Sequence, residues 1–267
     1  MADPYVALCE AGRMADPSDV APGVLVFTSR TMVTTSTVVH DGTRALLVDP
    51  AWRAEELQAI ADVLADRGLQ VELGWATHAH HDHLLWHPRF GSAPRWATPS
   101  AAATARVHLA EVRAALEPTL PAGLRDLAGQ VQAFDGARLP WSGPVAEVVV
   151  HQAHSPGHGA LWLPEAQVLL AGDMLSDTEI PLCAETGVAA YASGLERLEP
   201  YVHQAQVLVP GHGAPARAGT ADSPAARLAA DRAYLEALAA GGGQDDPRLR
   251  GAPAWLVAEH EANSASR

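Results

Sequence analysis

The chain alternates short apolar, β-branched segments with amphipathic helical segments, and it does so in the same order twice. In the first half, strand-like runs occur at residues 24–28, 35–40 and 45–48. A helical pattern follows at 52–67, and one more strand-like run at 71–77. In the second half, the corresponding segments are residues 130–134, 146–151, 160–163, 168–171, 189–198 (helical) and 207–209. A change of apolar period from two to about 3.6 residues is typical of sheets with covering helices. We therefore predict an α/β (α+β) fold, a four-layer αββα sandwich of two mixed β-sheets with helices outside.

Three segments are expected along the chain. Residues 1–22 are acidic and read as an N-terminal extension, residues 23–241 as one domain, and residues 242–267 as a C-terminal helical segment and tail. Further helices are predicted at 99–116 and 223–240, the latter ending at three glycines. A chain of 267 residues that is 48% hydrophobic can bury a large core.

Composition excludes several classes of function. The formal net charge is −13 and all 18 basic residues are arginine, so the basic surface of a nucleic-acid-binding protein is absent. No apolar run reaches the ~20 residues of a membrane span, and the N-terminus does not resemble a signal peptide. Cys9 and Cys183 are too few and too far apart for a disulfide framework. We expect a cytoplasmic protein with a small-molecule substrate and with no nucleic-acid or membrane partner. The sequence is compatible with a homodimer but does not require one.

The run "THAHHDHLL" at residues 77–85 concentrates metal-binding side chains. In an extended chain, positions i and i+2 point to the same side, so His78 and His80 can reach one cation. Neighbouring side chains diverge, so Asp82 and His83 could serve a second site close by. Imidazole and carboxylate groups are typical zinc ligands. The spacing therefore indicates two metal ions.

Additional donors occur where three later apolar runs end. They are His158 in "HSPGHG", Asp173 in "LLAGDM" and His212 in "LVPGHG". A glycine precedes each of them, which lets the backbone approach an ion without an intervening side chain. His81 is interpreted as structural, and His151 and His154 are assigned no role.

These motifs, in this order, resemble those of the metallo-β-lactamase superfamily, and the resemblance spans roughly residues 23–215. It implies a first metal on His78, His80 and His158. It implies a second metal on Asp82, His83 and His212, with Asp173 bridging the two. Asp49 matches a carboxylate that supports the ligands without binding metal. The cofactor implied is two Zn²⁺ per chain, with iron or manganese as alternatives.

The resemblance also implies a chemistry, which is hydrolysis by a metal-activated water. Asp82 would orient this nucleophile as the catalytic residue. We expect cleavage of an ester, lactone, thioester or amide bond in a small molecule. Two alternatives stay open: a di-iron or mixed-metal redox or sulfur-oxidising member of the fold, and a non-catalytic metal-binding protein. The oxygen-reducing branch has glutamate where this chain has His80, which favours zinc hydrolysis.

The branch of the family is not defined by the motifs. Leu84 and Leu85 stand where glyoxalase II enzymes have glycines, and Ser176 stands where lactonases have a tyrosine. Lysine, which many β-lactamases use for the substrate carboxylate, is absent. The residues predicted to line the substrate pocket are Trp86, His87, Arg89, Met32 and Ser176.

Overall fold

The computed structural model describes residues 16–265, which form two β-sheets packed face to face. The first sheet contains, in spatial order, β1 (Ser18–Ala21), β2 (Val24–Thr28), β3 (Thr35–His40), β4 (Arg44–Val48), β5 (Gln70–Trp75), β6 (Arg95–Ala97) and β7 (Gln132–Ala133). The second contains β12 (Ala216–Arg217), β11 (Val207–Pro210), β10 (Val168–Gly172), β9 (His158–Leu163) and β8 (Glu147–His151). Each sheet combines parallel and antiparallel pairs. Both sheets are therefore mixed, as predicted.

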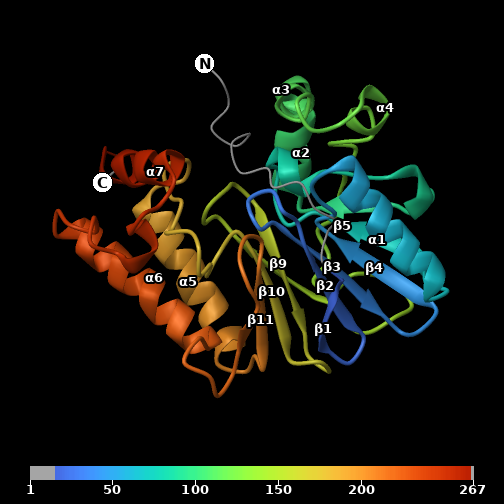
Figure 1. Cartoon of the computed structure of the whole chain (residues 1–267). Coiled ribbons are helices and arrows are strands. Elements are labelled where there is room, and N and C mark those ends of the chain that lie inside the picture. The colour runs from blue at the N-terminus through green and yellow to red at the C-terminus, as the bar shows by residue number, and fades with distance from the viewer. Residues whose placement is uncertain (1–15, 266–267) are drawn as a thin grey trace.

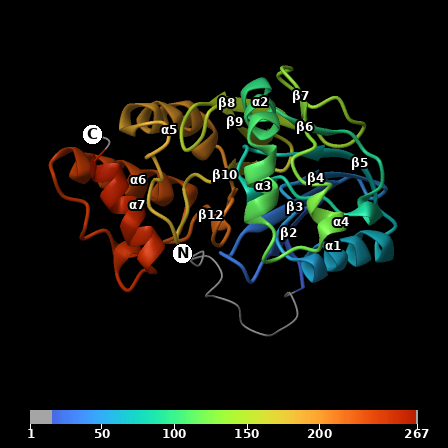
Figure 2. The same ribbon diagram turned by 90° about the horizontal axis from the view of Figure 1, so that it is seen from above.

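Helices cover the outer faces of the sandwich (Figure 1). Those beside the first sheet are α1 (Ala54–Asp66), α2 (Pro99–Val107), α3 (Leu109–Ala115) and α4 (Ala122–Arg125). Those beside the second sheet are α5 (Val188–Val202), α6 (Pro224–Ala239) and α7 (Ala254–Ala265). Short 3-10 turns occur at η2 (His81–His83), η3 (Pro88–Phe90) and η4 (Pro247–Leu249). The same two groups of helices separate in the view from above (Figure 2), and the predicted αββα order is confirmed.

Burial on both faces explains why the strands read as unbroken apolar runs. In β2, Leu25 and Phe27 belong to the core cluster that includes residues of α1 and α2. The alternate residues Val24 and Val26 belong to the cluster between the two sheets. A strand with such a pattern places an apolar side chain at every position, because neither face meets water.

The structure differs from the predicted elements in three short strands and one helix. The strands β1, β6 and β12 have two to four residues each, too few for a periodic signal. The β1 strand pairs with β2, so the first sheet begins within the segment expected to be an extension. The predicted helix at 99–116 is divided at His108 into α2 and α3. Residues 1–15, including Cys9, lie outside the described residues, and Cys183 is buried.

Within residues 16–265, none of the helices combines the length and the apolar character needed to cross a membrane.

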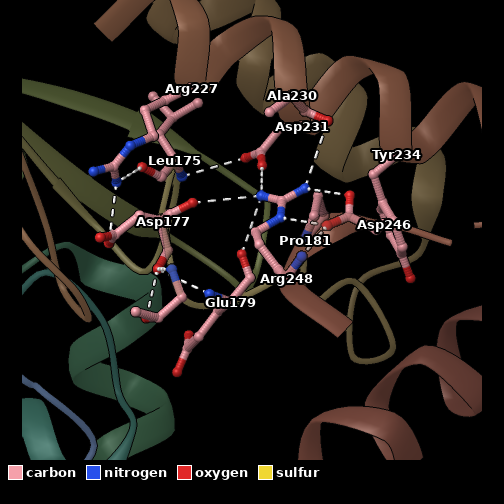
Figure 3. A network of polar contacts seen from close by, with 12 residues as sticks. Leu175, Asp177, Glu179, Pro181, Arg227, Ala230, Asp231, Tyr234, Asp246 and Arg248 are labelled. Carbon is pink, nitrogen blue, oxygen red and sulfur yellow. Dashed lines mark hydrogen bonds and ion pairs between the residues drawn. The ribbon is translucent and has the colours of Figure 1, made fainter. Parts of the chain in front are cut away.

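A network of polar contacts attaches the C-terminal region to the loop that follows β10 (Figure 3). The Arg248 Nη1 atom in η4 donates to Asp231 Oδ1 in α6 at 2.5 Å and to the carbonyl oxygen of Glu179 at 3.1 Å. Asp231 Oδ2 accepts a hydrogen bond from the backbone nitrogen of Leu175 at 3.3 Å. Asp246 also accepts from Arg248, through Nη2 at 3.0 Å. The region after Gly241 therefore fixes the loop at residues 174–187.

Replacement of Arg248 is predicted to destabilise the protein. Arg248→Met leaves Asp231, which is 1% exposed, without its cation, and losing one partner of a buried ion pair costs about 3–5 kcal/mol. Urea denaturation measures the loss in the free energy of unfolding. The exposed neighbour Arg250→Met serves as the control, and an equal, small effect of both substitutions would contradict this assignment.

Candidate metal centre

The buried imidazole and carboxylate groups meet where the strands of both sheets end. His78 and His80 follow β5, His154 follows β8, Asp173 follows β10 directly, and His212 follows β11. The turn η2 carries Asp82 and His83. Donors that are more than a hundred residues apart in the chain are thus brought together at one edge of the sandwich.

The donors form two groups. One contains His78, His80, His154 and Asp173, and the other contains Asp82, His83 and His212; within each group the ligand atoms lie within 4.8 Å of one another. The first group is joined to the second by Asp173. Its Oδ2 lies 3.3 Å from His154 Nε2 and 3.4 Å from His212 Nε2, while its Oδ1 lies 3.1 Å from His83 Nε2. One carboxylate therefore contacts both groups.

The structure places His154, and not the predicted His158, in the first group. His154 Nε2 lies 3.0 Å from His80 Nδ1. His158 is fully buried behind the group, with its ring stacked between those of His78 and His151 at centroid distances of 5.1 and 4.5 Å. The sequence-based assignment of His158 is therefore corrected to His154.

The strand bounds of the structure separate the two histidines, which both lie between the strands predicted at 146–151 and 160–163. Every other donor lies in the segment that follows the end of a strand, and His154 does so too, three residues after β8. His158 instead begins β9, in which all six residues are buried. Both histidines flank the same Ser-Pro-Gly, so the local motif alone could not distinguish them.

Three histidines have an oxygen 3.0 Å from the Nδ1 atom of the ring, and for His78 and His212 this contact is a hydrogen bond. His212 Nδ1 lies 3.0 Å from the carbonyl oxygen of Met32, and His83 Nδ1 lies 3.0 Å from Asp49 Oδ2. His78 Nδ1 lies 3.0 Å from Thr77 Oγ1, which itself donates to Asp49 Oδ2. These contacts leave the Nε2 atom of each ring for the centre, the arrangement that metal-binding histidines commonly adopt.

Asp49 acts on the ligands through both of its oxygens. Its Oδ1 accepts from the backbone nitrogen of Thr77 at 2.8 Å, and its Oδ2 accepts from the Thr77 hydroxyl and contacts His83. It is absent from both donor groups. Asp49 therefore holds the loop after β5 and the ring of His83 in place.

Burial and charge divide the histidines into two kinds. Burial lowers the pKa of His78 well below its usual value, with the charge of His83 as a second cause, so its ring is neutral and offers a lone pair. Burial also opposes protonation of His83, but the carboxylates of Asp173, Asp82 and Asp49 outweigh it and raise the pKa of His83. The surroundings of His78 thus disfavour a proton on its ring, whereas those of His83 favour one. A metal cation bound between the imidazoles and the carboxylates, in place of protons, satisfies both.

The donor set fits a pair of metal ions. The Nε2 atoms of His78 and His83 are buried and make no hydrogen bond within the described residues. Imidazole nitrogens face one another and a shared carboxylate, which is unfavourable without a cation between them. The residues suited to hold one ion are His78, His80, His154 and Asp173, and those suited to hold the other are Asp82, His83, His212 and Asp173.

A cavity of about 350 Å³ opens onto both groups. Its walls come from both halves of the chain and from α7, and they consist of Met32, Trp52, His80, His81, Asp82, His154, Asp173, Glu179, Leu182, Ala184, Glu185, His212, Trp255 and Glu259. Of the five residues predicted to line the pocket, only Met32 does so.

The other four predicted pocket residues lie elsewhere. Trp86 is buried, and its ring packs on Phe90 and beneath the guanidinium of Arg95. His87 caps η3, and Arg89 pairs with Asp62. Ser176 donates from its hydroxyl to the carbonyl oxygen of His212 at 2.7 Å and so fixes that ligand from behind. After the ligands, Leu84, Leu85 and Trp86 are buried in the core, whereas Arg89 is exposed on the surface.

Residues of the cavity that the sequence did not indicate include Glu179, Glu185, Trp52, Trp255 and Glu259. Burial raises the pKa of Glu179 to about 7. Trp255 and Glu259 are four residues apart on α7 and therefore share a face of that helix. This spacing could have suggested a common role, but nothing in the sequence connects α7 with the histidine motifs.

Comparison with known proteins agrees with this fold. Residues 30–228 match the family model of the metallo-beta-lactamase superfamily. A metallo-beta-lactamase family protein from Thermus thermophilus is similar in structure, with a TM-score of 0.63 at 23% identity, covering 92% of this chain and 91% of that one. A beta-lactamase domain protein from Burkholderia ambifaria has a TM-score of 0.62 at 20% identity, covering 85% and 79%. The DIM-1 metallo-beta-lactamase has a TM-score of 0.61 at 18% identity, covering 85% and 99%.

The match over most of the chain shows that it belongs to the metallo-β-lactamase superfamily. The resemblance expected from the sequence motifs is thereby confirmed.

The metal content of two variants tests whether His154, rather than His158, is the ligand of the first group. His154→Ala removes one donor of the first group, so we expect a loss of about one metal ion per chain. His158→Gln changes a buried ring outside both groups, so it should keep the metal content and lower the melting temperature instead. Inductively coupled plasma mass spectrometry measures the content; metal loss in His158→Gln alone would restore the original assignment.

Loss of the Asp49 carboxylate is predicted to weaken metal binding without removing a ligand. Asp49→Asn withdraws the negative charge beside His83 Nδ1, and such supporting groups change metal affinity about 10- to 100-fold. Competition with a chromophoric chelator measures the affinity. The exposed Asp245→Asn is the control, and equal affinities in the two variants would argue against this role.

Proposed function

We propose that the protein is a zinc-dependent hydrolase with a binuclear centre, acting on an ester, lactone, thioester or amide of a small molecule. The observation that carries the proposal is the contact of Asp173 with both donor groups at the floor of an open cavity. Bound divalent ions supply Lewis acidity, which polarises a carbonyl group and makes water a stronger nucleophile at neutral pH. Imidazole and carboxylate donors without thiolates suit zinc, and they also accept iron or manganese.

The chain's own residues provide orientation and proton transfer. Asp82 lines the cavity, and its Oδ2 is held between His212 Nε2 at 3.1 Å and His83 Nε2 at 3.2 Å. A carboxylate fixed in this way can accept a hydrogen bond from the attacking water, align it and take its proton. The cavity walls would hold the substrate carbonyl against this edge.

The C-terminal walls of the cavity restrict the substrate to a small molecule. A volume of about 350 Å³ lies in the range of small-ligand pockets, and Leu182, Trp255 and Glu259 limit it on one side. The net charge of −13 and the absence of lysine also favour a small molecule over a nucleic acid. We further propose a cytoplasmic location.

A hydrolysis screen tests the proposed function. Aryl esters, lactones, thioesters and β-lactams are supplied to the purified protein with its metal, after chelation, and after return of zinc or iron. We expect hydrolysis of at least one class that is lost on chelation and restored by zinc. Asp82→Asn should lower kcat/KM by about 10²–10⁴-fold. Restoration by iron alone, or cleavage that survives chelation, contradicts a zinc hydrolase.

A further inference from the structure

Apart from histidines, the ionisable residues that line the cavity beside the metal centre are all acidic. Its charged walls are Asp82, Asp173, Glu179, Glu185 and Glu259. Among the described residues no arginine contributes to these walls, and the whole chain lacks lysine. A cleft lined by one sign of charge focuses its potential on the ligand inside it. This cavity is therefore suited to a positively charged group.

Among these carboxylates, Glu179 combines burial of its side chain with the absence of a hydrogen bond to its carboxylate within the described residues. Its residue is 6% exposed, and its carboxylate makes no hydrogen bond within the described part of the chain. The nearest donor, His212 Nδ1, is 3.8 Å away and already lies 3.0 Å from the carbonyl oxygen of Met32. A buried carboxylate whose ion pair is this long is poorly compensated, so its position on the cavity wall points to a ligand that donates to it.

The backbone of Glu179 is held firmly while its side chain is left free for the cavity. Its nitrogen donates to Ser176 Oγ at 3.1 Å, and its carbonyl oxygen accepts from Arg248. In Figure 3 its carboxylate points away from the Arg248 network. The Arg248 guanidinium is 7% exposed and pairs with Asp231 and Asp246, so it does not neutralise Glu179.

Two indole rings line the same cavity. Trp52 is 3% exposed, and Trp255 of α7 packs against the cluster formed by Met32, Ala51 and Trp52. Tryptophan attracts cations more strongly than other aromatic side chains do. A cavity lined by both indoles and a carboxylate favours an ammonium group, which can donate hydrogen bonds and contact an aromatic surface at the same time.

We propose that the substrate carries a protonated amine, which binds between Glu179 and the indoles of Trp52 and Trp255 while its scissile bond faces Asp82. This inference rests on the proposed hydrolase function. Two divalent ions would bring four positive charges, and the surrounding carboxylates Asp49, Asp82, Asp173, Glu179, Glu185 and Glu259 outnumber them. The metal centre therefore does not turn the cavity into an anion site.

A binding experiment tests the amine site independently of catalysis. Hexylammonium and hexanol are titrated into the full-length protein with its metal and after chelation, with tryptophan fluorescence and calorimetry as readouts. We expect hexylammonium to bind at least about tenfold more tightly than hexanol, because its charged amine donates to a carboxylate and the alcohol does not carry that charge. In Glu179→Gln this preference should fall below about twofold, whereas the exposed Glu196→Gln keeps it. Equal affinities in the unmodified protein overturn the proposal.

A matched series of substrates tests the same site in turnover. The 4-nitrophenyl esters of 6-aminohexanoate, hexanoate and adipate share one scissile bond and differ in the charge of the distal end. We expect kcat/KM to fall in that order, and Glu179→Gln to remove the advantage of the amine. A ratio that is the same in Glu179→Gln and Glu196→Gln overturns the proposal. Glu259→Gln provides a second test if Glu179→Gln does not fold.

The two proposals fail in different ways. If no ester, lactone, thioester or amide is cleaved but hexylammonium still binds through Glu179, the hydrolase proposal fails and the amine site stands. If hydrolysis occurs while hexylammonium and hexanol bind alike, the hydrolase proposal stands and the amine site is refuted.

Discussion

The contact of one carboxylate with two sets of imidazoles is the constraint on which the rest of the structure depends. Asp173 can reach both sets only if the ends of β10 and β11 come very close together. The backbone nitrogen of Gly211 donates to the carbonyl oxygen of Gly172 at 2.6 Å. A Cβ atom at Gly211 would lie 1.9 Å from Asp173 Oδ1, so a side chain at this position is excluded. The glycine before the ligand His212 thus follows from the position of Asp173.

The same edge joins the two sheets. The backbone nitrogen of Thr35 in β3 donates to the carbonyl oxygen of Gly211 at 2.7 Å, next to the ligand His212. The loop before Thr35 is fixed by the buried Glu56 of α1, which accepts from the Ser29 hydroxyl and the backbone nitrogen of Arg30. Helix, loop and both sheets therefore define the position of a single imidazole, which gives the rigidity that a metal site requires.

Sequence patterns predicted the parts of the protein that are local in the chain. The strands at 24–28 and 35–40 agree with β2 and β3, because both segments are rich in β-branched residues, which favour strands. The cluster at residues 78–83 was readable because its donors are neighbours. His154 was missed because two histidines flank one turn and only the end of β8 decides between them. Glu179 and Trp255 were not readable at all, since tertiary packing alone brings them to the centre.

The helix α7 lies beyond residue 228, where the match to the superfamily ends, yet it supplies Trp255 and Glu259 to the cavity. Every donor of the metal centre lies before that point. The metal centre and one wall of the cavity are therefore encoded in separate stretches of the chain. Exchange of the terminal helix offers a way to alter which molecules enter, while the loops that perform the reaction keep their own sequence.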